Sequence, residues 1–399
     1  MAALWNRGRV AALMDIAIVA PCPIPYTIGG AENLWRGLQD HINEHTPHQA
    51  EVIKLPSPEH SFWALVDSYR RFAALDLRGF DLVVTGKYPA WMIEHRTHVC
   101  YMLHRLRGLY DTYHFLGMPD RYPDAPAPVV ELREFMASSE GRREELDEFF
   151  ARLGRLRNAT HLPSDLFAFP GPFAREVVHF LDGIGLAPSA IARFGAISAT
   201  VRDREGYFPP ERDVFVAHPP TALKGAQGRR AGSYLFTASR LDGPKRIDLL
   251  VRAMEHAPAA ARLRIAGTGP DEQALRELAA GNPRIELLGR VTAEQLGSLY
   301  AGARAIVFVP YLEDFGYITL EGMRAGRPVI TCTDSGGARE LVTDGVTGLV
   351  AEPTPEALGD AIGQLWNERR LARRLGRAAR KRASKVAWEV VVRELVSAE

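Results

Sequence analysis

Arg240 and Lys245 stand five residues apart in the segment 239–246, which reads Ser-Arg-Leu-Asp-Gly-Pro-Lys-Arg. The segment directly follows residues 234–238, which have the composition of a buried strand. A Gly-Pro turn and a helix start would then place both cations at the carboxyl end of that strand. Two cations there can hold a diphosphate and stabilise the charge that grows on it as a bond to it breaks. We favour this interpretation over two ordinary surface cations, because the chain has only six lysines and helix starts usually favour acidic residues.

Glu313 and Glu321 form a second candidate site, separated by seven residues and preceded by the apolar segment 305–309. Gly316 between them permits close backbone approach, and the helix expected after it would offer unpaired amides to a phosphate. Carboxylates accept hydrogen bonds from sugar hydroxyls, so Glu313 suits a sugar and Glu321 a ribose diol. The alternative is an acidic loop followed by one acidic residue on an apolar helix.

Short Val/Ile/Leu-rich runs alternate with segments of helical periodicity in both halves of the chain, which is the pattern of strand-helix repeats around parallel sheets. The strands expected in the first half are 16–20, 50–55, 81–85, 99–103 and a short one near 196–201. Those expected in the second half are 234–238, 263–266, 285–288, 305–309 and 328–331. We also expect a helix after Gly30, with Leu34, Trp35, Leu38 and Ile42 on one face, and a charged amphipathic helical stretch over 131–158.

A chain of 399 residues exceeds what one hydrophobic core usually supports. The best linker candidate lies between Val216 and Ser233, where Pro, Gly and polar residues dominate. We therefore predict two doubly wound α/β domains, 1–218 and 219–385, with the carboxyl ends of both sheets facing a central cleft.

Charge and cysteine content exclude several classes of function. The formal net charge is +1, so binding to nucleic acid through phosphate neutralisation is not expected. Cys22, Cys100 and Cys332 are far apart in the sequence and odd in number, which argues against a disulfide framework and favours a reducing cytoplasm. No apolar run reaches the ~18 residues of a membrane span. Residues 369–385 include nine basic and no acidic residues; a solvated helix face is favoured over peripheral contact with a membrane.

The order of motifs in the second half resembles that of family-4 retaining glycosyltransferases, which have the GT-B fold. The segments that carry the resemblance are Arg240 with Lys245, Gly267-Thr268-Gly269-Pro270, Leu288-Gly289-Arg290-Val291, Glu313 with Glu321, Ser335-Gly336-Gly337-Ala338-Arg339-Glu340, and 344–350 (Asp-Gly-Val-Thr-Gly-Leu-Val). The first half matches through Gly29-Gly30-Ala31-Glu32, Ala196-Ile197-Ser198 with Val201, and Trp388-Glu389. The resemblance implies that the first domain, 1–218, binds the acceptor and that the second, 219–385, binds the nucleotide-sugar donor. It also implies that the closing helix, 386–399, packs back on the first domain and completes it.

His104, in Tyr101-Met102-Leu103-His104-Arg105-Leu106-Arg107-Gly108-Leu109-Tyr110-Asp111, resembles a histidine that contacts the sugar in one branch of the family. That branch commonly has a proline two residues later, where this chain has Leu106. The resemblance implies catalytic roles for His104, Glu313, Arg240 and Lys245. It implies a donor site that consists of Gly29, Gly30, Arg240, Lys245, Gly267, Val291, Glu313, Phe315, Gly316, Tyr317, Ile318 and Glu321.

The implied reaction moves a hexosyl group from a UDP- or GDP-sugar to a hydroxyl of a glycan, glycolipid or small molecule, with retention at the anomeric carbon. The departing diphosphate would receive the proton of the incoming hydroxyl on the same face. The chain has no Asp-x-Asp sequence, so we expect metal independence, no cofactor, and the nucleotide sugar as co-substrate. The donor base, the sugar, the acceptor and the oligomeric state stay open. Aromatic side chains that suit either an acceptor or core packing are Trp63, Tyr88, Trp91, Tyr110, Tyr113 and Tyr122.

Four other functions fit parts of the sequence. A nucleotide-binding dehydrogenase fits Gly267-Thr268-Gly269 but not Glu272, which stands where its third glycine or alanine is needed. The segment 41–45, His-Ile-Asn-Glu-His, matches a zinc-protease pattern, but nothing else supports a hydrolase. A nucleotide-sugar epimerase of the same fold is a closer rival, since it too would hold a nucleotide diphosphate. A non-catalytic sugar-nucleotide-binding module would not need both glutamates together with Arg240 and Lys245.

Overall fold

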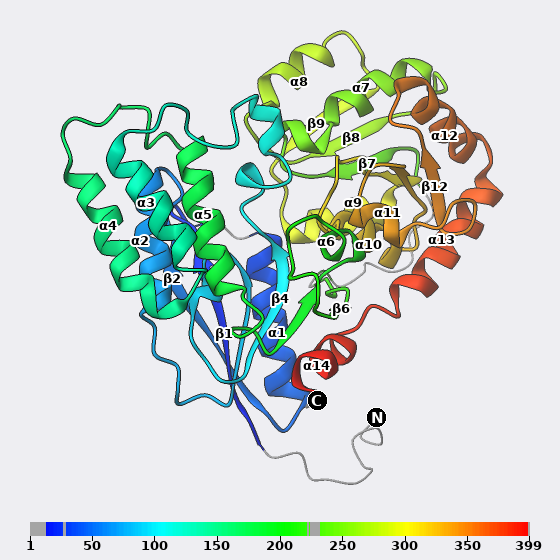
Figure 1. Ribbon diagram of the computed structural model, residues 1–399. Coiled ribbons are helices and arrows are strands. Elements are labelled where there is room, and N and C mark those ends of the chain that lie inside the picture. Colours follow the sequence, from blue (N-terminus) through cyan, green and yellow to red (C-terminus); the bar gives the residue numbers. More distant parts are fainter. Residues whose placement is uncertain (1–12, 27–28, 222, 224–231, 398–399) are drawn as a thin grey trace. The chain divides into compact units, whose positions relative to one another are not determined.

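The computed structural model describes residues 13–26, 29–221, 223 and 232–397. The chain divides into two compact units (Figure 1). The first consists of the residues up to Gly195, Arg204–Phe215 and the residues from Glu394 onward, and the second of Ala196–Asp203 and Val216–Arg393. The roles expected for 1–218 and 219–385, acceptor and donor binding, stay predictions.

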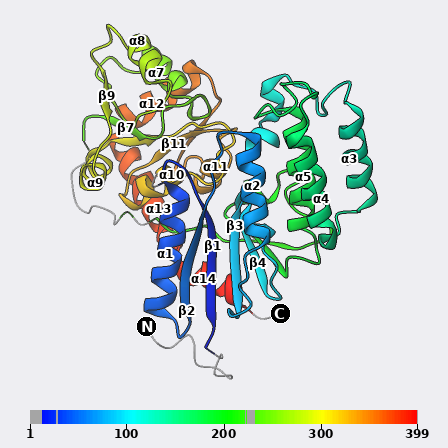
Figure 2. The same cartoon turned by 90° about the vertical axis from the view of Figure 1, so that its left-hand side faces the viewer.

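The first unit is built on a six-stranded sheet with the strand order β2-β1-β3-β4-β5-β6. β1 runs parallel to both β2 and β3, and β3 runs parallel to β4. Figure 2 shows these four strands next to one another, beside α1 and α2. The strands are β1 Asp15–Cys22, β2 Gln49–Pro56, β3 Leu82–Lys87, β4 His98–His104, β5 Arg193–Ala196 and β6 Val214–Val216.

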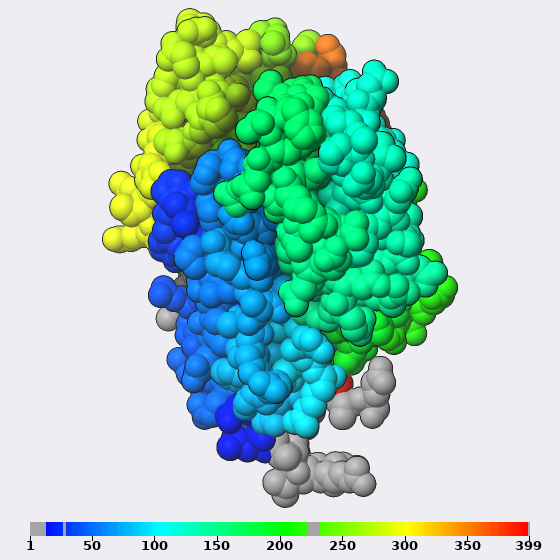
Figure 3. All heavy atoms as spheres, turned by 60° about the vertical axis from the view of Figure 1, so that its left-hand side comes forward, coloured from blue at the N-terminus to red at the C-terminus, as the bar shows by residue number. Residues whose placement is uncertain are grey.

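Helices with apolar faces cover this sheet. In α1, Leu34, Trp35, Leu38 and Ile42 are buried, as their spacing predicts. On the face shown in Figure 3, the teal to green segment that contains α3 to α5 lies beside the blue segment of the first strands and helices. The helices of this part of the chain are α1 Gly30–His45, α2 Phe62–Ala73, α3 Ala127–Ser138, α4 Leu146–Asn158 and α5 Pro172–Gly185.

The end of the described chain fastens to the first unit. Arg193 at the start of β5 donates from Nη1 to the carbonyl oxygens of Glu394 at 2.7 Å and Ser397 at 2.9 Å. Glu394 lies in the last helix, α14 Trp388–Val396. One guanidinium thus connects a central part of the sequence to its last described residues.

The second unit holds another six-stranded sheet, with the order β12-β11-β10-β7-β8-β9. All of its adjacent strands run parallel. α7 and α12 pack together and bury Leu250, Met254, Leu358 and Ile362 in the core. The strands are β7 Leu235–Ala238, β8 Leu263–Ala266, β9 Ile285–Gly289, β10 Ala305–Val307, β11 Val329–Cys332 and β12 Gly348–Ala351. The helices are α6 Ala199–Arg202, α7 Ile247–His256, α8 Glu272–Leu278, α9 Ala293–Gly302, α10 Tyr317–Arg324, α11 Gly337–Leu341, α12 Pro355–Asn367 and α13 Arg369–Ala383.

One sequence-based expectation about a single element is wrong. The strand expected near 196–201 ends at Ala196, because the hydroxyl of Ser198 caps the short helix α6 by accepting a hydrogen bond from the Val201 amide at 3.0 Å. The helical stretch expected over 131–158 is present as two helices. Glu140 and Gly141, with φ of 49° and 70°, adopt left-handed backbone that ends the first of them.

The prediction of two doubly wound parallel sheets is confirmed, whereas a central cleft between the two domains stays a prediction.

Among the described residues, no helix combines the length and the apolar character that crossing a bilayer requires. Residues 369–385, which were expected to form a helix, contain α13. Its basic side chains are exposed, while Leu375 and Ala379 are buried. Among the described residues, Cys22, Cys100 and Cys332 are free thiols.

Gly267 is required for the close approach of two loops in the second unit. Its φ is 129°, and a Cβ there would stand 1.8 Å from the carbonyl oxygen of Ser239. We predict that Gly267→Ala lowers the free energy of unfolding by about 2–4 kcal/mol, because both the backbone and the loop must shift. Urea denaturation measures the loss.

Gly281→Ala is the matched control for this substitution. Gly281 also has a positive φ, 81°, but a Cβ there would have no atom within 4 Å. It should cost only the backbone strain, about 1 kcal/mol. Equal losses in the two variants would contradict the steric explanation.

Candidate functional site

The segments that follow the six strands of the second unit lie at one edge of its sheet, because all the strands run parallel. β7 and β10 are adjacent although β8 and β9 separate them in sequence, and the strand order runs outward from this pair in both directions. Ligands of doubly wound sheets bind outside the carboxyl ends of the strands at such a switch point. The loops after β7 and β10 contain Lys245 and Glu313 respectively.

Arg246 fixes the geometry of this switch point. Its Nε donates to the carbonyl oxygen of Val309 and its Nη2 to that of Pro310, both at 2.8 Å. The same guanidinium makes a bidentate pair with Asp334, at 2.7 and 2.6 Å. One side chain from the β7 loop therefore holds the loops after β10 and β11. Its own backbone is left-handed, with φ of 49°.

Lys245 and Glu313 are paired at this edge. Lys245 Nζ donates to Glu313 Oε2 at 2.5 Å, and the two side chains are only 22% and 19% exposed. The ammonium lies 6.0 Å from the centre of the Phe308 ring. Since an ammonium has three donors and a carboxylate has several acceptor positions, both groups keep hydrogen-bonding capacity beyond this pair.

The helix expected after Gly316 is present as α10, which begins at Tyr317. Gly316 has φ of 87°, and a Cβ there would stand 2.9 Å from the Cβ of Ala338. Tyr317 and Ile318 supply the first amides of the helix, which have no earlier carbonyl within it to bind. Phe315 is buried and stacks on His218, with ring centres 5.5 Å apart.

Glu321 lies in α10 and accepts two hydrogen bonds from the protein. Thr221 Oγ1 donates to its Oε1 at 2.9 Å, and the hydroxyl of Tyr300 donates to its Oε2 at 2.8 Å. Burial raises the pKa of Glu321 above its ordinary value, although both hydroxyls oppose that rise. The Tyr317 hydroxyl is also buried, and it has no hydrogen-bond partner among the described residues. Burial, and then the charge of Glu321, raises the pKa of Tyr317.

Other residues expected in the nucleotide-sugar site are placed differently from Lys245. The Arg240 side chain is 71% exposed, and its Nε lies 3.4 Å from Asp242 Oδ2. Gly267 serves the packing of two loops, as described above, and its amide donates to the Gly289 carbonyl at 2.8 Å. Val291 is half-buried beyond the end of β9. The structure thus brings Lys245, Glu313 and the start of α10 together, with Arg240 on the surface of the β7 loop.

In the first unit, Gly29 and Gly30 are exposed at the start of α1, after β1. The Gly29 amide donates to Glu32 Oε2 at 2.9 Å. His104 ends β4, and its Nδ1 lies 2.7 Å from the carbonyl oxygen of Arg105. The His104 ring meets Tyr88 edge to face, with centres 5.8 Å apart.

Most of the expected acceptor aromatics lie in or against the core. Trp91, Tyr88 and Tyr113 are buried, whereas Trp63 is half-buried. In the segment 41–45, His41 is 9% exposed and its ring centre lies 4.7 Å from that of His45. Among the described residues, no three His, Cys, Asp or Glu side chains are grouped to hold a metal ion.

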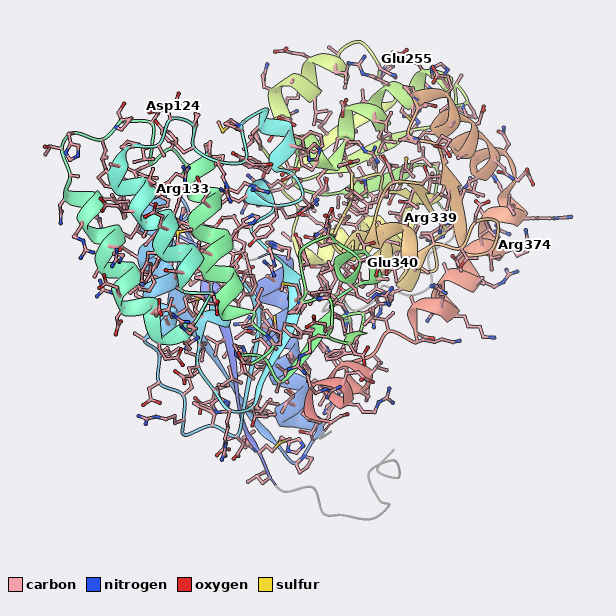
Figure 4. All side chains as sticks on the ribbon, viewed as in Figure 1. Asp124, Arg133, Glu255, Arg339, Glu340 and Arg374 are labelled. Carbon is pink, nitrogen blue, oxygen red and sulfur yellow. The ribbon has the colours of Figure 1, made fainter. Side chains whose placement is uncertain are left out.

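Sequence reasoning missed the roles of Arg246 and Glu340. Arg246 directly follows Lys245, so a third cation in that motif was the available signal. Glu340, labelled in Figure 4, accepts from the Ala199 amide at 2.9 Å and from the Thr200 amide and hydroxyl, both at 2.5 Å. Ser198 Oγ also donates to the Asp314 carbonyl at 2.5 Å. Together, Glu340 and Ser198 attach α6 to α11 and to the loop that carries Glu313.

Comparison with known proteins identifies the second half of the chain. Residues 227–382 match the family model described as Glycosyl transferases group 1. A D-inositol 3-phosphate glycosyltransferase of Mycobacteroides abscessus is 33% identical over 195 residues, which are 46% of this chain and 43% of that protein. This chain thus spans about half the length of the curated relatives that it matches.

Solved structures share the fold of the whole chain. Sucrose-phosphate synthase of Thermosynechococcus elongatus has a TM-score of 0.63 at 17% identity, covering 96% of this chain and 97% of its own. HepE of Anabaena in complex with UDP-glucose has a TM-score of 0.61 at 14% identity, covering 95% and 96%. The predicted GT-B fold is confirmed, and the resemblance to glycosyltransferases is confirmed for residues 227–382. Retention and metal independence stay predictions.

Glu340 gives a test of the α6 attachment. Burial works to raise its pKa, but hydrogen bonds from His218, Thr200 and Ala199 hold the pKa below the ordinary 4.5. The unfolded carboxyl therefore binds a proton more readily, so its contribution to stability is present above pH 4.5 and is lost as pH falls through the lower folded pKa. We predict that Glu340→Gln costs about 1–2 kcal/mol at pH 7 and less at each step below pH 4.5.

Chemical denaturation of the native protein and the variant at a series of pH values measures this difference. Glu255→Gln, an exposed carboxylate on α7 that is also labelled in Figure 4, is the control and should have little effect at any pH. A difference for Glu340→Gln that stayed constant down to pH 3 would contradict the role of the ionised carboxylate.

Proposed function

We propose that this chain, whose second unit contains a glycosyl transferases group 1 domain, is a metal-independent retaining glycosyltransferase. It moves a hexosyl group from a UDP- or GDP-sugar to a hydroxyl of a glycan, glycolipid or small molecule. The observation that carries the proposal is the pairing of Lys245 with Glu313 at the switch point of the second sheet, in the loop that leads to the start of α10.

Lys245 and the first amides of α10 would hold the diphosphate of the donor. When the bond between the anomeric carbon and the diphosphate oxygen breaks, negative charge grows on that oxygen. A preorganised ammonium and unpaired amides stabilise this charge more than the ground state, which is the requirement for catalysis. Arg246 supports this function indirectly, because it holds the loop after β10 in place.

Retention follows in this proposal from the path of the proton. The acceptor hydroxyl forms its new bond to the anomeric carbon on the face that the diphosphate leaves. Its proton passes to the departing diphosphate oxygen, so the products are the glycoside and a nucleoside diphosphate. No strong side-chain base is needed, and none of the described groups at the switch point is assigned that role.

Glu313 and Glu321 would recognise the hydroxyls of the donor. Glu313 is charged, partly exposed and beside Lys245, which suits the transferred sugar. Glu321 already accepts from Thr221 and Tyr300, so a ribose diol would use its remaining lone pairs. His104 of the first unit would contact the transferred sugar, and Gly29 with Gly30 would permit close approach of the backbone to the donor.

A nucleotide-sugar panel tests the proposed transfer. We expect one of UDP-glucose, UDP-N-acetylglucosamine or GDP-mannose to raise the melting temperature and to release nucleoside diphosphate slowly to water. Lys245→Met should lower that release about 100-fold or more, and Glu313→Gln should lower it too. Lys381→Met, which removes an exposed lysine of α13, is the control and should match the native rate.

Three results would contradict this function. An epimerised donor without an acceptor would indicate the epimerase. Donor binding with no release of nucleoside diphosphate, even with a panel of acceptors, would indicate a binding module. Full turnover by Lys245→Met would remove the assignment of the diphosphate site. Proton NMR of the first glycoside formed reports whether the anomeric configuration is retained.

Metal independence is tested separately. Because the leaving diphosphate is assigned to an ammonium and backbone amides, we expect turnover in millimolar EDTA to equal turnover without it. Nucleoside diphosphate release measured before and after chelation provides the comparison. A loss that magnesium or manganese restores would show that a cation is needed.

A further inference from the structure

We propose that Asp182, a buried carboxylate of α5, positions His104 by holding two groups that contact its ring. This inference rests on the proposed function, in which His104 contacts the transferred sugar. Asp182 is a positioning residue in this scheme, since it does not itself touch His104. Two separate chains of contacts lead from its carboxylate to the imidazole.

Asp182 is fully buried and accepts three hydrogen bonds from side chains. The Tyr69 hydroxyl and Trp91 Nε1 donate to its Oδ1 at 2.7 and 2.8 Å. The Tyr110 hydroxyl donates to its Oδ2 at 2.7 Å. A buried charge is costly unless it is well paired. A carboxylate that is kept at this depth with three neutral donors therefore points to a specific role in holding those donors.

The first chain of contacts passes through Tyr110 and Arg105. Arg105 is 7% exposed and donates from Nη1 to the Tyr110 oxygen at 2.9 Å and from Nη2 to the Tyr207 carbonyl at 2.9 Å. Its guanidinium also lies 4.9 Å from the centre of the Tyr110 ring. These contacts fix the residue whose carbonyl oxygen lies 2.7 Å from His104 Nδ1.

That carbonyl oxygen sets the protonation of the His104 ring. A carbonyl can only accept, so Nδ1 must carry the hydrogen of the bond. In the neutral imidazole, Nε2 is then the nitrogen with the lone pair. Asp182 therefore acts on both the orientation and the tautomer of His104, through Tyr110 and Arg105.

The second chain of contacts passes through Trp91 and Tyr88. Trp91 is fully buried, and its indole is fixed by the hydrogen bond to Asp182. Its ring meets Tyr88 edge to face at 6.5 Å, and Tyr88 meets His104 edge to face at 5.8 Å. The wall against which the imidazole packs is therefore anchored to the same carboxylate.

The donors to Asp182 stay protonated in this arrangement. Burial, and then the negative charge of Asp182, raises the pKa of both Tyr69 and Tyr110 well above the ordinary value. Neither hydroxyl ionises in the working range of pH, so both continue to donate hydrogen bonds to Asp182. Tyr69 differs from Tyr110 in one respect: it bonds Asp182 from α2, and neither chain of contacts described above passes through it.

This difference supplies a matched pair of variants. Tyr110→Phe and Tyr69→Phe each remove one hydroxyl that donates to Asp182 at 2.7 Å. Tyr110→Phe also removes the acceptor of Arg105 Nη1, so its melting temperature should fall at least as far as that of Tyr69→Phe. Only Tyr110→Phe breaks the path to Arg105 and His104. With the nucleotide sugar of the panel that the native protein turns over, we expect Tyr110→Phe to lower turnover about tenfold through kcat, with KM changed less than about twofold, while Tyr69→Phe keeps turnover within about twofold of native.

Nitrogen NMR of the full-length protein labelled in its 12 histidines gives a second readout that needs no substrate. His104→Gln identifies the signals. The native protein and Tyr69→Phe should show His104 with Nδ1 protonated, and Tyr110→Phe should move both ring nitrogens toward averaged tautomers. Asp182→Asn, if it folds, should give at least the change seen with Tyr110→Phe.

The outcomes separate this inference from the proposed function. Unchanged His104 signals in Tyr110→Phe, or equal changes in Tyr69→Phe, would overturn the positioning role and leave only a structural carboxylate. If the native protein turned over neither UDP-glucose nor the other donors, the proposed function would fail, and the imidazole signals would still decide whether Asp182 sets the state of His104.

Discussion

The geometry of the second unit depends on the guanidinium of Arg246. Arg246 belongs to the loop after β7. Its guanidinium binds two carbonyl oxygens of the loop after β10 and the carboxylate of Asp334 in the loop after β11. Lys245 is the preceding residue, so its backbone is placed once Arg246 is fixed, and its ammonium donates to Glu313 at 2.5 Å. The pair that Lys245 makes with Glu313 is therefore a product of the scaffold and is prepared before any ligand arrives.

The sequence predicts much of this unit because its constraints are local. The runs 263–266 and 285–288 are apolar and correspond to β8 and β9, and the motif residues stand directly after the strands that position them. Some elements were harder to predict. β12 was not among the expected strands, and α6, which has four residues, has a cap that competes with the strand pattern around Ile197. At this length, a tertiary contact such as that of Glu340 outweighs intrinsic propensity.

Less of the first unit could be predicted from the sequence, because its polar contacts join segments that are far apart along the chain. Asp182 bonds residues that are 113, 91 and 72 positions away along the chain. No spacing rule connects them, and an aspartate within an apolar helix has no signature of its own. The position of His104 after a strand could be predicted. The tautomer and the packing of its ring could not, since both depend on neighbours that only the fold brings together.

The attachment of Arg193 to the carbonyls of Glu394 and Ser397 has a consequence for synthesis on the ribosome. The first sheet emerges early, yet its fifth strand finds two of its acceptors only after roughly 200 further residues have been translated. When the first sheet leaves the ribosome, the Arg193 guanidinium therefore still lacks these two carbonyl partners. The order of translation and the order of contacts differ in this chain, because the second sheet is synthesised before Arg193 can bind them.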